Sequence, residues 1–138
     1  MKWFPDDCQT GDMLRIPVGS FYHYGIYVSD DEVIEFGDAP LGGFGRDESA
    51  IRVIAVTVDA FSHGIIPEKA HLDAAERKKA YSPAEIAARA RARLGEGGYS
   101  LLHNNCEHFV NSCTFGESTC SVADAVREEW MKRLGTKG

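Results

Sequence analysis

Two short apolar segments separated by three polar residues most constrain how this chain can fold. The segments are HYGIYV, residues 23–28, and EVIEF, residues 32–36, and the sequence Ser-Asp-Asp at residues 29–31 lies between them. Alternating apolar side chains on either side of turn-forming residues are typical of a β-hairpin. The alternation places one set of side chains on a common face of this hairpin: His23, Gly25, Tyr27 and Glu35.

The length of the turn also predicts how the two strands pair. A three-residue loop at residues 29–31 would place Gly25 opposite Glu35. His23 then lies diagonally from Glu35, about 7–8 Å away between backbones, which a glutamate side chain can span. Gly25 has no side chain that could block the path between them. The hairpin therefore predicts a contact between an imidazole and a carboxylate.

Further strands are expected on both sides of the hairpin. One is DMLRIPV, residues 12–18, and another is IRVIAVTV, residues 51–58, which has apolar side chains on both faces. That pattern is typical of a central or well-covered strand. Residues 59–81 are polar and irregular, with room for a short strand near residues 64–68. A connection of this length often forms a functional lid.

The C-terminal half predicts three helices. The first should span residues 82–95, the second residues 105–116 and the third residues 121–134. The first is delimited by Ser82 as N-cap, Pro83 at the first helical position, Glu85 completing a capping box and Gly95 as C-cap. The expected buried stripes are Ile86, Ala90 and Leu94, then Cys106, Phe109, Val110 and Cys113, then Val122, Val126, Trp130 and Leu134.

This order, strands first and helices after, predicts an α+β fold in a single domain spanning residues 1–138. A chain of 138 residues with 43% hydrophobic residues can bury a core of its own. Its formal net charge of −6 offers no positive field for nucleic acid. We find no signal peptide or membrane-spanning segment, so a soluble, cytoplasmic protein is expected.

Cys106 is the strongest candidate for chemistry. It falls in the first turn of the second predicted helix, where Asn104 or Asn105 is a natural N-cap. The partial positive charge and free N–H groups of a helix N-terminus favour a thiolate and can stabilise an oxyanion. A thiol held against a sheet needs a base, and the hairpin offers His23. We therefore expect Cys106 as nucleophile, His23 as general base and Glu35 as the residue that orients it.

Two other roles for this cysteine are compatible with the sequence. A lone cysteine on an apolar helix face usually behaves as a small hydrophobic residue. A zinc site could use His103, Cys106, His108 and Cys113. Helix geometry weakens that site, because side chains two residues apart diverge by about 200°. The remaining cysteines lack a helix-start setting with a base and are expected to be inert: Cys8, Cys113 and Cys120.

Two segments resemble the lecithin:retinol acyltransferase (LRAT) family and its H-rev-type phospholipase/acyltransferase relatives. They are residues 11–37, with the Gly-Asp strand and the hairpin, and residues 81–118, with the motif Asn-Cys-Glu-His-Phe. The resemblance implies a circularly permuted NlpC/papain-like fold, in which an antiparallel sheet supplies His and a helix supplies Cys. By motif position, Cys106 is the nucleophile and His23 the general base. The third position is usually His in these enzymes, and here it is Glu35.

The resemblance also implies an activity. An acyl group of a lipid ester would pass to Cys106 as a thioester, and then to water, as in a phospholipase A, or to an alcohol or amine. No metal or organic cofactor is expected, and the partners would be an acyl lipid and, peripherally, a membrane surface. Two alternatives stay open: a thiol amidase or peptidase of the same fold, and a non-catalytic module that binds lipid or protein.

Overall fold

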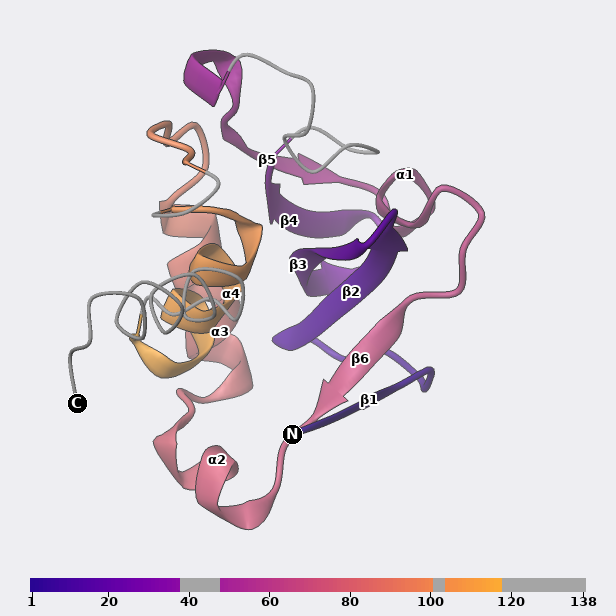
Figure 1. Ribbon diagram of the computed structural model, residues 1–138. Coiled ribbons are helices and arrows are strands. Elements are labelled where there is room, and N and C mark those ends of the chain that lie inside the picture. The colour runs from indigo at the N-terminus through magenta and orange to yellow at the C-terminus, as the bar shows by residue number, and fades with distance from the viewer. Residues whose placement is uncertain (38–47, 101–103, 118–138) are drawn as a thin grey trace, which may run out of the picture.

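The computed structural model describes residues 1–37, 48–100 and 104–117. These residues form an antiparallel sheet of six strands in the order β1-β6-β2-β3-β4-β5, with helices packed on both faces (Figure 1). The predicted α+β class is therefore confirmed. Among the described helices, none is long and apolar enough to cross a bilayer.

The elements are as follows. The strands are β1 (Lys2–Phe4), β2 (Asp12–Val18), β3 (Phe21–Ser29), β4 (Glu32–Phe36), β5 (Val53–Val56) and β6 (Glu68–His71). The helices are α1 (Val58–Ser62), α2 (Ala74–Lys79), α3 (Pro83–Ala92) and α4 (Cys106–Phe115), with a 3-10 turn at Glu48–Ala50.

The sheet separates two apolar cores. Helices α3 and α4 lie on one side of the sheet and α1 on the other (Figure 1). The larger core lies between the sheet and α3 and α4, and includes Ile26, Ile34, Phe36, Ile86 and Phe109. The smaller core lies under α1 and consists of Leu14, Ile16, Tyr27, Val33 and Phe61. The division follows the strand alternation, because neighbouring side chains of a strand point to opposite faces.

The predicted hairpin is confirmed, including its register. Gly25 pairs with Glu35 and Ile26 with Ile34. Strand β3 continues through Ser29, which pairs with Glu32 after a shift of register that begins at Tyr27. The turn is therefore one residue shorter than predicted. Because the irregularity lies at the turn, it does not change the pairing of Gly25 with Glu35.

The strand predicted at residues 51–58 is wrong in length and in position. Strand β5 covers only Val53–Val56 and is the last strand in the sheet order, so it is not central. It ends because Thr57 caps α1, its Oγ1 accepting a hydrogen bond from the Ala60 N–H at 3.1 Å. The predicted strand had apolar residues on both faces partly because it included Val58. Val58 belongs to α1 and packs against the smaller core.

The prediction of an irregular segment at residues 59–81 is also wrong. It contains most of α1, all of β6 and all of α2, and the short strand lies at Glu68–His71 rather than near residues 64–68. Helix α2 begins with a capping box in which the Asp73 carboxylate accepts from the Glu76 N–H at 2.8 Å and Glu76 accepts from the Asp73 N–H at 3.0 Å. The sequence pattern did not predict these elements because they are short and carry many polar side chains.

Of the two described C-terminal helices, α4 matches its predicted bounds at both ends and α3 matches only at its start. Ser82 is the N-cap of α3, but the helix ends at Ala92 with Arg93 as C-cap, not Gly95. Leu94 therefore leaves the helical phase and is 44% exposed, so its predicted burial is wrong. Helix α4 has the predicted extent, with Asn105 and Gly116 as caps, and all four residues of its stripe are buried. The helix predicted at residues 121–134 lies outside the described residues.

Candidate active site

His23 and Glu35 form a buried pair between neighbouring strands. The His23 Nε2 atom lies 3.0 Å from Glu35 Oε2, a hydrogen bond that also joins unlike charges when the imidazole is protonated. His23 is 1% exposed and Glu35 is fully buried. The contact follows from the register of β3 and β4, as predicted from the hairpin. A fixed Nε2 contact leaves Nδ1 as the ring nitrogen for other chemistry.

Gly25 makes room for this pair. A Cβ atom at this position would lie 2.8 Å from Phe61 Cε1 and 2.9 Å from Val33 Cγ1, closer than side chains pack. The Phe61 ring also lies beside the His23 ring, with 5.4 Å between centroids. Gly25 therefore allows Phe61 of α1 to pack over the imidazole and exclude water from it.

Replacing Gly25 with alanine is expected to lower the free energy of unfolding by about 1–3 kcal/mol, because the added methyl overpacks Phe61 and Val33. Urea unfolding followed by circular dichroism would measure this. The matched control is Gly97→Ala, whose methyl would meet only the far end of the Arg52 side chain at 2.8 Å. Arg52 can move, so the control should change stability by less than Gly25→Ala. Equal effects of the two variants would contradict the packing argument.

Cys106 is the first residue of α4 and is 6% exposed. The Asn105 side chain caps the helix and accepts from the N–H groups of Glu107 at 2.9 Å and His108 at 3.1 Å. In return, His108 Nδ1 accepts from the Asn105 N–H at 3.0 Å. His108 is therefore part of a capping box, so its ring serves the helix. The cap fixes the start of α4 at Cys106.

The structure brings the Cys106 thiol to the imidazole that Glu35 holds. Burial lowers the pKa of His23, but hydrogen bonding and charge from Cys106 and Glu35 outweigh burial and raise the pKa to about 10. Among the described residues, His23 Nδ1 has no hydrogen-bond partner of standard geometry. The thiol contact is therefore looser than the carboxylate contact. Catalytic hydrogen bonds are commonly loose before substrate binds.

The thiol and the imidazole come from different layers. Helix α4 packs with Phe36 in the larger core, whereas His23 contacts Phe61 on the α1 side. The β3–β4 register places Phe36 opposite Tyr24, so His23 lies one residue beyond the end of β4. At this end of the sheet, the imidazole is not covered by β4 and a thiol from the helix layer can reach it.

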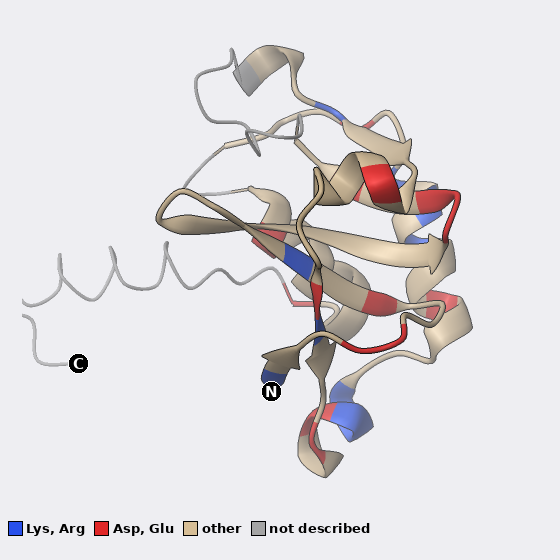
Figure 2. Ribbon diagram, turned by 90° about the vertical axis from the view of Figure 1, so that its right-hand side faces the viewer, with Lys and Arg blue, Asp and Glu red and all other residues tan. Residues whose placement is uncertain are grey.

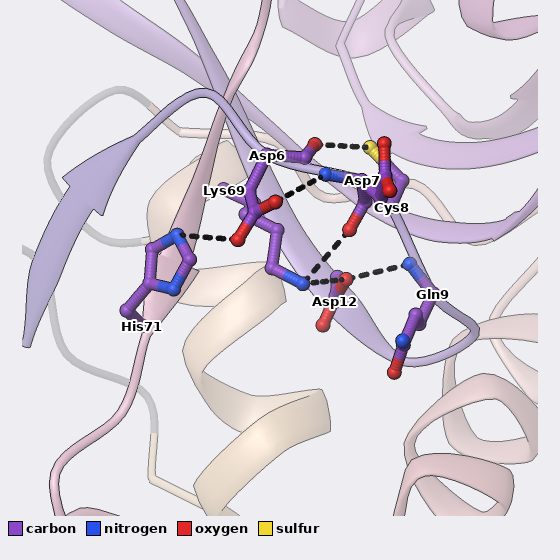
Figure 3. Close-up of polar contacts among 7 residues, drawn as sticks. All are labelled: Asp6, Asp7, Cys8, Gln9, Asp12, Lys69 and His71. Carbon is purple, nitrogen blue, oxygen red and sulfur yellow. Dashed lines mark hydrogen bonds and ion pairs between the residues drawn. The ribbon is translucent and has the colours of Figure 1, made fainter.

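The other described cysteines lie in settings that favour the thiol. Cys8 belongs to an N-terminal polar group around Lys69, whose Nζ donates to Asp12 Oδ2 at 2.9 Å and to the Asp7 carbonyl at 3.0 Å (Figure 3). Burial and the charge of Asp12 raise the pKa of Cys8. Burial likewise raises the pKa of Cys113 to about 11. Neither cysteine has a base comparable to His23.

One group near the site was missed by the sequence analysis. The Arg15 guanidinium lies 4.5 Å from the Trp3 ring centroid and 3.9 Å from that of Tyr22, and its Nε donates to Glu68 Oε1 at 2.7 Å. Tyr24, directly opposite Arg15 in β2–β3, stacks edge-on against Trp3 at 5.7 Å. We call Trp3, Arg15, Tyr22, Tyr24 and Glu68 the Arg15 cluster. The pairing of β2 with β3 could have predicted the Arg15–Tyr24 contact. Trp3 lies on β1, a strand that was not predicted from the sequence.

The zinc alternative receives no structural support. Within residues 1–37, 48–100 and 104–117, no three His, Cys, Asp or Glu side chains are arranged to hold a metal ion. His103, one of the four ligands considered, lies outside the described residues.

A buried thiol near an imidazole that is hydrogen-bonded to a carboxylate is the arrangement that enzymes use for nucleophilic catalysis by cysteine. Comparison with known proteins gives the family. The family model described as "Lecithin retinol acyltransferase" matches residues 6–119. The chain belongs to this family, as its motifs suggested.

The curated relatives come from two groups within that family. Lecithin retinol acyltransferases of Bos taurus and Homo sapiens are each 36% identical over 132 residues, which cover 83% of this chain and 57% of theirs. Phospholipase A and acyltransferase 1 of Rattus norvegicus is 25% identical over 143 residues, covering 98% of this chain and 80% of its own. The chain thus spans 57% of the length of the first two relatives.

Proposed function

We propose that this chain transfers or hydrolyses the acyl group of a lipid ester through a thioester on Cys106. The observation that carries the proposal is that one buried imidazole, His23, is hydrogen-bonded to the Glu35 carboxylate and lies near enough to the Cys106 thiol for that thiol to raise its pKa. The relatives, named as acyltransferases and phospholipases, support a lipid ester as substrate. We also propose that residues 1–138 form one domain with the permuted NlpC/papain-like topology, in which a sheet histidine serves a helix cysteine.

The first half of the reaction acylates the enzyme. His23 takes the thiol proton on Nδ1, and Cys106 Sγ attacks the ester carbonyl carbon to form a C–S bond. The tetrahedral intermediate then collapses, and its bond to the alkoxide oxygen breaks. The proton on His23 passes to that oxygen, so the lysolipid leaves as a neutral alcohol.

The second half restores the thiol. Water, an alcohol or an amine gives a proton to His23 and attacks the thioester carbonyl. The C–S bond breaks, the thiolate leaves and the imidazolium returns its proton to Cys106. Water as acceptor makes the chain a phospholipase A, and the other acceptors make it an acyltransferase. No step uses a metal or an organic cofactor.

The start of α4 also supplies a donor for the oxyanion. The Asn105 cap uses the N–H groups of Glu107 and His108. The Cys106 N–H is the first amide of the helix and cannot bond within it. It adjoins the reacting sulfur, where negative charge develops on the substrate carbonyl oxygen.

Glu35 stabilises the imidazolium, which allows the thiolate–imidazolium pair to exist before substrate binds. A neutral partner at this position would accept a hydrogen bond without supplying charge. The carboxylate does both, because its Oε2 contacts Nε2 directly. The replacement of the family's usual histidine by Glu35 is therefore compatible with acyl transfer.

Replacing Glu35 with glutamine should move the alkaline limit of acylation to lower pH. The carboxylate raises the pKa of His23, so its removal lets the imidazolium lose its proton at lower pH. The rate of acyl-enzyme formation across pH would show the shift. The control is Glu32→Gln, on the same strand but paired with Arg91 near the surface. The role of Glu35 is contradicted if Glu35→Gln and wild type share one alkaline limit.

A panel of substrates separates the alternatives. Wild type and Cys106→Ala would be compared on phosphatidylcholine and on peptide amides, with products separated by chromatography. Cys106-dependent release of fatty acid and lysolipid supports the proposal, whereas Cys106-dependent cleavage of peptides alone supports the amidase. A non-catalytic module would process neither, and iodoacetamide would alkylate its Cys106 at the same rate with and without His23.

A further inference from the structure

The turn between β2 and β3 exposes apolar side chains beside the site. Strand β2 ends at Val18, which pairs with Phe21, so Gly19 and Ser20 form a two-residue turn. Gly19 has a φ of +61°, which such tight turns require. Phe21 is 38% exposed and Tyr22 is 42% exposed. An open hollow of about 290 Å³ is lined by the four residues from Val18 to Phe21. We call residues 18–22 the hairpin tip.

Charge is distributed unevenly along this hairpin. Residues 17–22 carry no charged side chain, whereas Asp12, Asp30 and Asp31 lie at the opposite end of the same two strands. Strand length places these acids on the order of 20 Å from the tip. Figure 2 shows the turn projecting at the left without red or blue, and the acidic segments of the hairpin lying to the right. A surface rich in phosphate would meet the tip and avoid the acids.

The Arg15 cluster adds an amphipathic layer just behind the tip. The Tyr22 ring stacks on Arg15 at 3.9 Å, and Arg15 in turn lies over Trp3. Aromatic side chains with a polar edge and long cationic side chains favour the boundary between lipid headgroups and acyl chains. The apolar tip would therefore lie among the acyl chains of a bilayer, and the amphipathic layer behind it would lie at the headgroups.

The tip leads directly to the reacting groups. Phe21 and His23 belong to the same strand and share a face, so they lie only about 7 Å apart along β3. The hollow at the tip therefore lies close to the imidazole that contacts Cys106. A lipid whose glycerol backbone stays at the membrane boundary could present its ester to the thiol after moving a short distance.

We propose that the hairpin tip, residues 18–22, docks the protein on a phospholipid bilayer, with Phe21 among the acyl chains and Tyr22, Trp3 and Arg15 at the headgroups. This inference rests on the proposed function, because it explains how a lipid ester reaches Cys106. The occupant is a bilayer, since the tip is uncharged and the acids of the hairpin lie at its far end. An apolar protein partner is the competing occupant.

The test measures binding to vesicles without turnover. The chain of residues 1–138 carrying Cys106→Ala would be sedimented with phosphatidylcholine vesicles, with and without added phosphatidylserine. Phe21→Ser should lower the partition coefficient about tenfold, since it removes a large apolar side chain from the boundary. The matched control Leu94→Ser removes an apolar side chain that is 44% exposed elsewhere, and should leave partitioning unchanged.

A second variant, which should bind vesicles more tightly than wild type, distinguishes a loss of docking from misfolding. Ser20→Trp adds an aromatic side chain at the tip and should raise the partition coefficient, which an unfolded variant would not do selectively. Absence of wild-type binding to vesicles, an equal loss with Leu94→Ser, or no gain with Ser20→Trp would overturn the proposal. Such a failure would leave intact an acyl adduct on Cys106 formed from dispersed lipid. Failure of the proposed function would appear instead as absence of that adduct.

Discussion

Replacing Cys106 with alanine is expected to reduce turnover of a lipid ester by about four orders of magnitude or more, because the variant lacks the sulfur on which the proposed thioester forms. Among the described cysteines, Cys106 is the one whose thiol raises the pKa of a paired imidazole. Fatty acid release from phosphatidylcholine, measured by mass spectrometry, gives the rate. Only the loss of kcat with intact folding, checked by circular dichroism, counts as agreement.

The control for this prediction lies on the same helix. Cys113→Ala removes a buried thiol two turns further along α4, where burial raises the pKa and favours the unreactive form. We expect turnover within a few-fold of wild type and a modest loss of stability from the small cavity. A Cys106→Ala variant with turnover like that of Cys113→Ala would remove Cys106 from the mechanism.

Replacing His23 with leucine is expected to have the largest effect on stability. Glu35 is fully buried, and its Oε2 would lose the imidazole at 3.0 Å. Its other oxygen, Oε1, already lacks a hydrogen-bond partner among the described residues. An uncompensated buried charge costs about 3–5 kcal/mol, which urea unfolding at neutral pH would measure. Loss of the proposed general base should also lower turnover by about 10²–10⁴-fold.

A second variant separates the charge from the packing. His23→Leu combined with Glu35→Leu removes both partners and replaces them with apolar side chains, which should recover most of the lost stability. Turnover should stay as low as in the single variant, because the base is still absent. For comparison, His71→Leu breaks a contact of 4.0 Å to the exposed Asp6 and should cost less than about 1 kcal/mol. A double variant as unstable as His23→Leu would contradict the account of the buried pair.

The hairpin was predictable because its information is local. Alternation assigned the faces of β3 and β4, and the predicted pairing of Gly25 with Glu35 is correct although the turn is one residue shorter than predicted. A one-residue slip would have reversed every side chain, so the buried face fixes the register. The N-cap at Asn105 was equally local, which is why the start of α4 could be placed.

The errors lie where structure depends on distant partners. Strand β6 is polar in sequence and exists because it pairs with both β1 and β2. The position of β5 at the sheet edge is likewise set by strand order, which no local pattern encodes. Thr57 offered a signal for α1, since a threonine before an acidic residue is a common helix start. The meeting of Cys106 with His23 could only be guessed from chemistry, because it depends on how α4 packs.

The most direct test of the account is to trap the acyl group. Wild type, Cys106→Ala and His23→Leu would be incubated with phosphatidylcholine, quenched in acid, digested and examined by mass spectrometry. We predict an acyl chain on the peptide that contains Cys106, labile to hydroxylamine, absent in Cys106→Ala and strongly reduced in His23→Leu. Acylation of a different residue, or a Cys106 adduct that forms equally well without His23, would contradict the claim that these two side chains act together.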